Sequence, residues 1–134
     1  MHLGLYGLAG ILAGKRAFPV IFAALLFQTI LFQHGGLLSL GLNAANMGTG
    51  ALLASLLWRS RVGPQAARAF LCGFVGVLTP ALLIAMEFSL TGYGKGFLFL
   101  SALYLGAAAL EGVLTVAIVS FLQRARPALL AART

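Results

Sequence analysis

The chain has 134 residues, of which 61% are hydrophobic and only 8% are charged. Soluble globular domains carry about a quarter of charged residues, so this composition excludes a soluble domain and favours an integral membrane protein. The formal charge of +7 would also suit nucleic-acid binding, but the basic residues stand in short clusters between apolar runs, which a membrane topology explains better.

Two other classes of protein are excluded by what the chain lacks. Cys72 is the single cysteine and lies inside an apolar run, so no disulfide forms within the chain and a metal–thiolate site is not expected. No Walker-type glycine loop is present, so the chain does not hydrolyse ATP by that route. No arrangement of nucleophile, base and acid can be assembled from its few ionisable residues. We therefore predict that the chain is not an enzyme.

Five apolar runs follow one another along the chain, at residues 3–14, 17–32, 47–58, 69–90 and 97–122. A helix that spans a bilayer needs about 20 apolar residues, and only the last two runs meet this comfortably. The first and third would reach about 18 Å, so they are either extended by neighbouring polar residues or re-entrant within the protein. Pro80 lies far enough inside the fourth run to kink a helix. We predict one all-α domain over residues 1–134, a polytopic membrane helix bundle of four to five segments.

The basic residues predict an orientation for this bundle. If each run crosses once, eight of the nine Lys and Arg residues share one face and only Lys95 falls on the other. The eight are Lys15, Arg16, Arg59, Arg61, Arg68, Arg124, Arg126 and Arg133. The positive-inside rule then places the C-terminus in the cytoplasm and both histidines, His2 and His34, on the outer side.

Small residues indicate close helix packing near the N-terminus. Gly4, Gly7 and Gly10 are spaced three apart, so they fall near one face of a helix. Such a face lets another membrane helix approach closely. The pattern is typical of ordinary membrane helix packing and does not by itself indicate a ligand site.

The N-terminal Met1-His2 pair has the chemistry of a metal chelate. The amine of Met1, the backbone nitrogen of His2 and its imidazole close five- and six-membered rings around one ion. These nitrogens favour square-planar nickel or copper, and cobalt is also compatible. His34, followed by Gly35 and Gly36, is the only other imidazole that could complete the square. A terminal histidine without a role, and a helix-end histidine bonded to backbone, explain the same residues.

Several polar residues could support such a site. Asn43 and Asn46 would either hydrogen-bond a re-entrant loop, which we favour, or line a polar path. Glu111 lies midway in the last apolar run, where an ionisable residue is costly and usually faces protein or water. It would either pack between helices or contact an ion, and Tyr104 lies two turns before it on nearly the same face. Glu87 stands near the end of its run and would reach the interface.

Two stretches of the chain carry a family pattern. The first comprises residues 2–14, Phe27-Gln28, 31–36, Leu40-Gly41, Asn43 and 46–48. The second comprises Glu111-Gly112, Thr115, Arg124, Arg126-Pro127 and Leu129-Leu130. This pattern resembles the CbiM/NikM family, the substrate-binding membrane components of energy-coupling factor transporters for cobalt and nickel.

The resemblance implies capture and translocation of Ni²⁺ or Co²⁺ as cargo, without a permanently bound cofactor. ATP would be hydrolysed by partners, namely a transmembrane coupling subunit and cytoplasmic ATPase subunits, and nucleic acid would not be a partner. The implied location is the inner (plasma) membrane of a prokaryote. Met1, His2 and His34 become the expected metal ligands. The expected supporting residues are Asn43, Asn46 and Glu111.

The chain departs from the family pattern at its front. Family members are usually longer and begin with Met-His before a segment absent here, and His2 aligns with their later histidine. Tyr104 also stands where a histidine is expected. The chain thus resembles the C-terminal two-thirds of a family member. The chain is either a truncated or split family member, for which a partner chain could supply the N-terminal segment, or a chain whose start is misassigned. The third interpretation is that Met1-His2 itself recreates the chelate. The rival interpretations are a degenerate or assembly subunit that completes a partner without transporting by itself, and an unrelated small permease for an organic substrate.

Overall fold

The computed structural model describes residues 4–32, 36, 39–92 and 97–131, and the described part of the chain is helical without strands. Its elements are α1 (Tyr6–Ala13), the 3-10 turn η1 (Gly14–Arg16), α2 (Ala17–Phe32), α3 (Leu40–Arg59), α4 (Gln65–Leu90), α5 (Phe97–Ala125) and α6 (Pro127–Ala131). The prediction of an all-α membrane bundle is confirmed.

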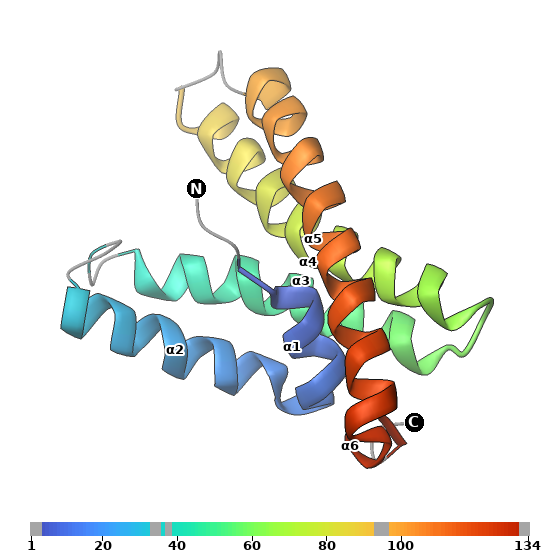
Figure 1. The fold of residues 1–134 in the computed structure, drawn as a ribbon. Helices are drawn as coiled ribbons and strands as arrows, with labels where there is room; N and C mark the ends of the chain where they lie inside the picture. Colours follow the sequence, from blue (N-terminus) through green and yellow to red (C-terminus); the bar gives the residue numbers. More distant parts are fainter. Residues whose placement is uncertain (1–3, 33–35, 37–38, 93–96, 132–134) are drawn as a thin grey trace.

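Four helical stretches within these described ranges are long and apolar enough to cross a membrane. They are Tyr6–Phe32, Leu40–Arg59, Gln65–Leu90 and Phe97–Ala125. The first two apolar runs of the sequence therefore form one continuous stretch, which is joined by η1. Figure 1 shows α1 and α2 meeting at an angle at this junction. Gly14, which follows α1 with a φ of 57°, provides the backbone conformation that L-residues rarely adopt.

The expectation of a loop around Asn43 and Asn46 is wrong. Both residues lie in α3, which begins at Leu40 and so extends the short third run to a length that can span a bilayer. The physical reason is that helical backbone satisfies its own hydrogen bonds, whereas a loop at membrane depth needs outside partners. The side chain of Asn46 is buried against α4, where its amide donates a hydrogen bond to Glu87.

The helices pack in two antiparallel pairs, which contact each other directly through α3 and α4 and which both contact α1. Helix α4 packs along α5, and α2 packs along α3. In Figure 1 the α2–α3 pair and the paired ends of α4 and α5 diverge as two arms. Helix α1 lies where they meet and contacts α3 and α4. A helix of eight residues thus forms the centre of the fold.

Glycines allow α1 to enter this position. A Cβ added at Gly7 would lie 2.1 Å from the backbone oxygen of Cys72, and one at Gly10 would lie 2.2 Å from that of Ala51. Only glycine permits backbones to approach this closely. The predicted small-residue face is therefore confirmed for Gly7 and Gly10. Gly4 precedes the helix and lies against the ring of Tyr6 instead.

Helix α4 bends near its middle, as predicted from Pro80 and as Figure 1 shows. Proline has no N–H, so the carbonyl of Gly76, four residues earlier, lacks its usual hydrogen bond from position 80. Gly50 of α3 packs at this point, where an added Cβ would lie 2.5 Å from the Gly76 oxygen and 2.9 Å from Pro80 Cδ. The bend and the close approach of α3 therefore coincide.

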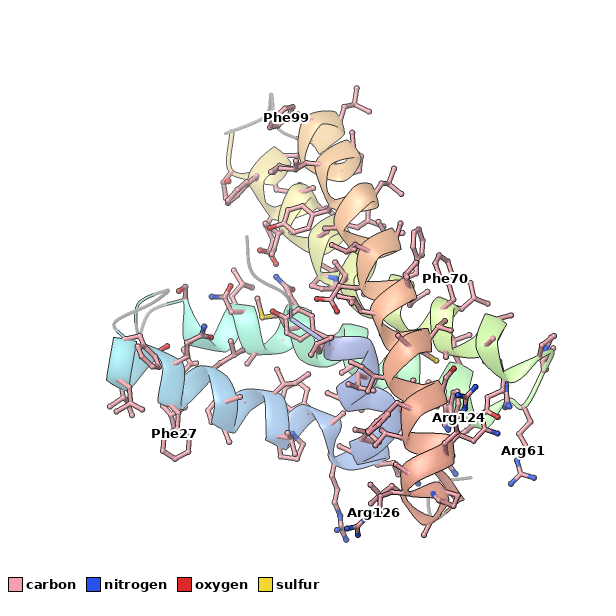
Figure 2. The ribbon with its side chains drawn as sticks, in the orientation of Figure 1. Phe27, Arg61, Phe70, Phe99, Arg124 and Arg126 are labelled. Carbon is pink, nitrogen blue, oxygen red and sulfur yellow. The ribbon has the colours of Figure 1, made fainter. Side chains whose placement is uncertain are left out.

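The surface is apolar around the helices and basic at one end. Figure 2 shows Phe27 of α2 and Phe99 of α5 pointing outward, and both side chains are more than 60% exposed. The labelled arginines Arg61, Arg124 and Arg126 gather towards the opposite, lower right region of the same view. Exposed phenylalanines are ordinary lipid-facing residues, and the basic end matches the predicted grouping of charge.

Candidate functional site

A cavity of about 520 Å³ lies among α1, α3, α4 and α5, beside the start of α1. Its polar and sulfur-containing lining residues are Tyr6, Met47, Tyr104 and Glu111. Gly4 also lines it, and most of the remaining wall is apolar. The cavity is much larger than a single metal ion, so an ion held here would need ligands that reach inward from the wall.

Glu111 supplies the charged group of this wall. Its side chain is 2% exposed, and it accepts backbone hydrogen bonds from two residues just before α1. The N–H of Gly4 donates to Oε1 at 2.5 Å, and the N–H of Leu5 donates to Oε1 at 3.1 Å and to Oε2 at 3.0 Å. Charge-assisted hydrogen bonds of this kind offset the cost of burying a carboxylate. Glu111 therefore fastens the start of α1 to the middle of α5.

The position of Glu111 follows from the close packing of α4 on α5. A Cβ added at Gly73 would lie 2.6 Å from the Glu111 carbonyl oxygen and 2.8 Å from Gly112 Cα. The hydroxyl of Thr115 donates to the same carbonyl at 2.7 Å. The N-terminal end of α1 also carries the positive end of its helix dipole, which favours a carboxylate there.

A second carboxylate, Glu87, is engaged away from the cavity. The side-chain amide of Asn46 donates to Glu87 Oε1 at 2.9 Å and so links α3 to α4. Asn43 donates to the hydroxyl of Ser39 at 3.5 Å, near the start of α3. Of the predicted supporting residues, only Glu111 therefore lines the cavity, and the two asparagines are engaged elsewhere.

The expected metal ligands Met1, His2 and His34 lie outside the described residues. Within the described ranges, no group of three His, Cys, Asp or Glu side chains could hold a metal ion. Cys72 is buried and its thiol donates to the backbone oxygen of Ala54 at 3.2 Å. Tyr104 and Glu111 both line the cavity, which agrees with their predicted position near one face of a helix.

Tyr6 and Met47 were missed as cavity residues. Tyr6 lies one residue after the glycine–leucine pair that Glu111 binds, and Met47 lies on α3 beside the buried Asn46. The sequence did contain one indication for Met47. It belongs to the 46–48 part of the family pattern, which distinguishes it from an ordinary lipid-facing residue.

Comparison with known proteins decides the family. The model of the cobalt uptake substrate-specific transmembrane region, CbiM, matches residues 1–129. The chain belongs to the CbiM family. The resemblance found in the sequence is thereby confirmed, as is the prediction of a transport component rather than an enzyme.

Curated relatives of this CbiM-family chain have metal-transport names. A putative metal transport protein of Haemophilus influenzae is 34% identical, covering 95% of this chain and 66% of that protein. The cobalt transport protein CbiM of Carboxydothermus hydrogenoformans is 36% identical over 88% of this chain and 54% of its own length. The fused nickel transport protein NikMN of Rhodobacter capsulatus is 30% identical over 98% and 46%. The chain thus spans about half to two thirds of the length of these relatives, and no solved structure matches it.

Proposed function

We propose that this chain is the membrane component that captures divalent cobalt or nickel for an uptake transporter of the energy-coupling factor type. The observation that carries this proposal is the match of the CbiM model to nearly the whole chain. The relatives named as cobalt and nickel transport proteins support both ions as cargo. The sequence does not favour one of them, because the nitrogen ligands that the two metals prefer overlap.

The proposed metal ligands are the Met1 amine, the His2 backbone nitrogen and imidazole, and His34. The geometry next to them supports this set. Gly4 lines the cavity and is held by Glu111, and His2 stands only two positions earlier in the chain. The Met1-His2 pair is therefore joined in the sequence, through one residue, to a segment that lines the cavity. Its amine, deprotonated amide and imidazole would hold Ni²⁺ or Co²⁺ by nitrogen.

The proposed partners supply the energy. Two relatives are named fused nickel transport proteins NikMN, which supports a second membrane component working with this one. Cytoplasmic ATPase subunits and a transmembrane coupling subunit would complete the transporter. The proposed site of action is the plasma membrane of a prokaryote. The four membrane-capable helices fit a multi-pass protein there.

Calorimetric titration of Ni²⁺ and of Co²⁺ into detergent-purified protein tests the proposal. The protein must keep its native N-terminus and carry no histidine tag. We expect near-stoichiometric binding in the wild type and its loss in His2→Ala, because that variant removes the imidazole from the chelate. His34→Ala should weaken binding less, since it leaves both chelate rings of Met1-His2 intact, whereas His2→Ala opens the six-membered ring.

The other outcomes separate the rival interpretations. No binding by the wild type would contradict autonomous capture and favour an assembly subunit that completes a partner. Binding that is unaffected by either histidine variant would contradict the ligand set and would fit a permease for another substrate.

A further inference from the structure

Glu111 makes contacts that reach across the whole chain. Its carboxylate lies on α5, yet its three hydrogen bonds go to Gly4 and Leu5, more than 100 residues earlier. Both oxygens are used, so the group is held in one orientation. The contacts go to backbone N–H groups, which fixes the path of the main chain rather than a side chain.

The backbone at Leu5 shows that this path is imposed. Leu5 has a φ of 48° and a ψ of 30°, a left-handed conformation that residues other than glycine, asparagine and aspartate rarely adopt. The turn presents the N–H groups of both Gly4 and Leu5 to the same carboxylate. Without that acceptor, the two half-buried N–H donors would have no partner. The cost of the left-handed backbone at Leu5 would then not be offset by any hydrogen bond to Glu111.

The anchored segment leads directly to the cavity. Gly4, Tyr6 and Glu111 all line it, and Tyr104 lines it from the same helix as Glu111. Glycines at 7 and 10 hold the helix that follows against the backbones of α4 and α3. The main chain that precedes Gly4 therefore starts from a fixed point beside the cavity wall.

We propose that Glu111 is a positioning residue for the proposed metal site, which acts by fixing the backbone of Gly4 and Leu5, the first described residues after Met1-His2 in the sequence. This inference rests on the proposed function. Glu111 binds no metal in this scheme and acts only through the backbone of Gly4 and Leu5. Groups that orient metal ligands from a distance typically change metal affinity by about 10- to 100-fold when they are removed.

The test compares two carboxylate-to-amide variants. Glu111→Gln removes the charge and one acceptor oxygen from the anchor. Glu87→Gln makes the same change at the other carboxylate but keeps an acceptor for Asn46 and lies outside the cavity. Each variant is studied by hydrogen exchange of the N-terminal peptide and by Ni²⁺ titration. We expect Glu111→Gln to speed exchange at Gly4 and Leu5 and to weaken Ni²⁺ binding by about tenfold or more. Glu87→Gln should change neither.

A third variant distinguishes position from charge. Glu111→Asp keeps the negative charge but withdraws the carboxylate by one methylene. A positioning role predicts weaker Ni²⁺ binding and faster exchange at Leu5, whereas a purely electrostatic role predicts wild-type affinity. This variant also decides the matter if Glu111→Gln fails to fold, as judged by helical circular dichroism.

The outcomes for the two proposals remain separate. Unchanged affinity in folded Glu111→Gln and Glu111→Asp would overturn the positioning role, even if the wild type binds metal well. Unchanged exchange at Leu5 would overturn the anchor itself. If the wild type binds neither Ni²⁺ nor Co²⁺, the proposed function fails, and the exchange measurement alone then decides whether Glu111 fixes the N-terminal segment.

Discussion

Single polar residues hold helices together inside this apolar bundle. Asn46 donates to Glu87 between α3 and α4, and Glu111 accepts from the backbone at the start of α1. A buried polar group is costly unless it is paired, so each contact ties two elements in one relative position. The described carboxylates thus act first as links between helices.

Replacing Asn46 by Leu should destabilise the protein by about 1–3 kcal/mol, because Glu87 then loses its donor within the bundle. Replacing both residues by Leu should recover most of that loss, since two apolar groups leave no acceptor unpaired. Thermal unfolding in detergent, followed by circular dichroism, measures both effects. A single variant as stable as the wild type would contradict a contribution of this pair to stability.

The sequence predicted which residues are unusual better than it predicted their partners. Glu111 stood out because a carboxylate in the middle of an apolar run is costly. Its partners could not be read from the sequence, because they are backbone N–H groups that any residue except proline carries. Asn43 and Asn46 were placed in a loop because their polarity outweighed the helix-forming residues around them. Within α3 the amide of Asn46 is satisfied by Glu87, which lies 41 residues later.

Helix α1 is an element too short to cross a membrane but necessary to the packing of the others. Its eight residues rise about 12 Å, and it contacts α2, α3, α4 and α5. Of the predicted runs, 69–90 and 97–122 closely match α4 and α5, because long apolar runs give clear helix boundaries. The joining of the first two runs at η1 depends on the tertiary contacts of α1. Hydropathy alone could not predict these contacts.

Gly7→Ala should displace α1 from this position. The new Cβ would meet the backbone oxygen of Cys72 at 2.1 Å, and a helix backbone cannot yield as a flexible side chain would. We expect a loss of about 1–3 kcal/mol from overpacking. Gly41→Ala is the matched control, because nothing lies within 4 Å of its added Cβ and alanine favours a helix. The thermal unfolding temperature should therefore fall for Gly7→Ala alone. Equal unfolding temperatures of the two variants would contradict the close packing of α1 on α4.

At the scale of the whole molecule, charge gathers at one end of the bundle. The described basic residues fall in η1, in and around the connection from α3 to α4, and at the end of α5 or just after it, whereas Lys95 follows α4 in the sequence. A grouping of this kind is what the positive-inside rule describes. The bundle itself was predicted from composition and hydropathy. The proposed ligands Met1, His2 and His34 lie outside the described residues, so the metal site stays a prediction.

The orientation gives a direct test on cells. Green fluorescent protein fused after Thr134 should fluoresce, because the positive-inside rule places the C-terminus in the cytoplasm, where this reporter folds. A fusion that ends the chain after Gly94 should stay dark, since that connection is expected on the outer side. The reverse pattern would contradict the predicted orientation and would place the connection that contains His34 on the cytoplasmic side.

The bend in α4 has a consequence for the cavity. The carbonyl of Gly76 lacks the hydrogen bond that a residue four positions later would donate, so a change in the bend angle works against one backbone hydrogen bond fewer in that turn. Val77 precedes Pro80 and Ile84 follows it, and both line the cavity. Straightening or deepening the bend would therefore move one part of the wall against the other. Helix α4 thus forms a wall of the cavity whose curvature sets the volume enclosed.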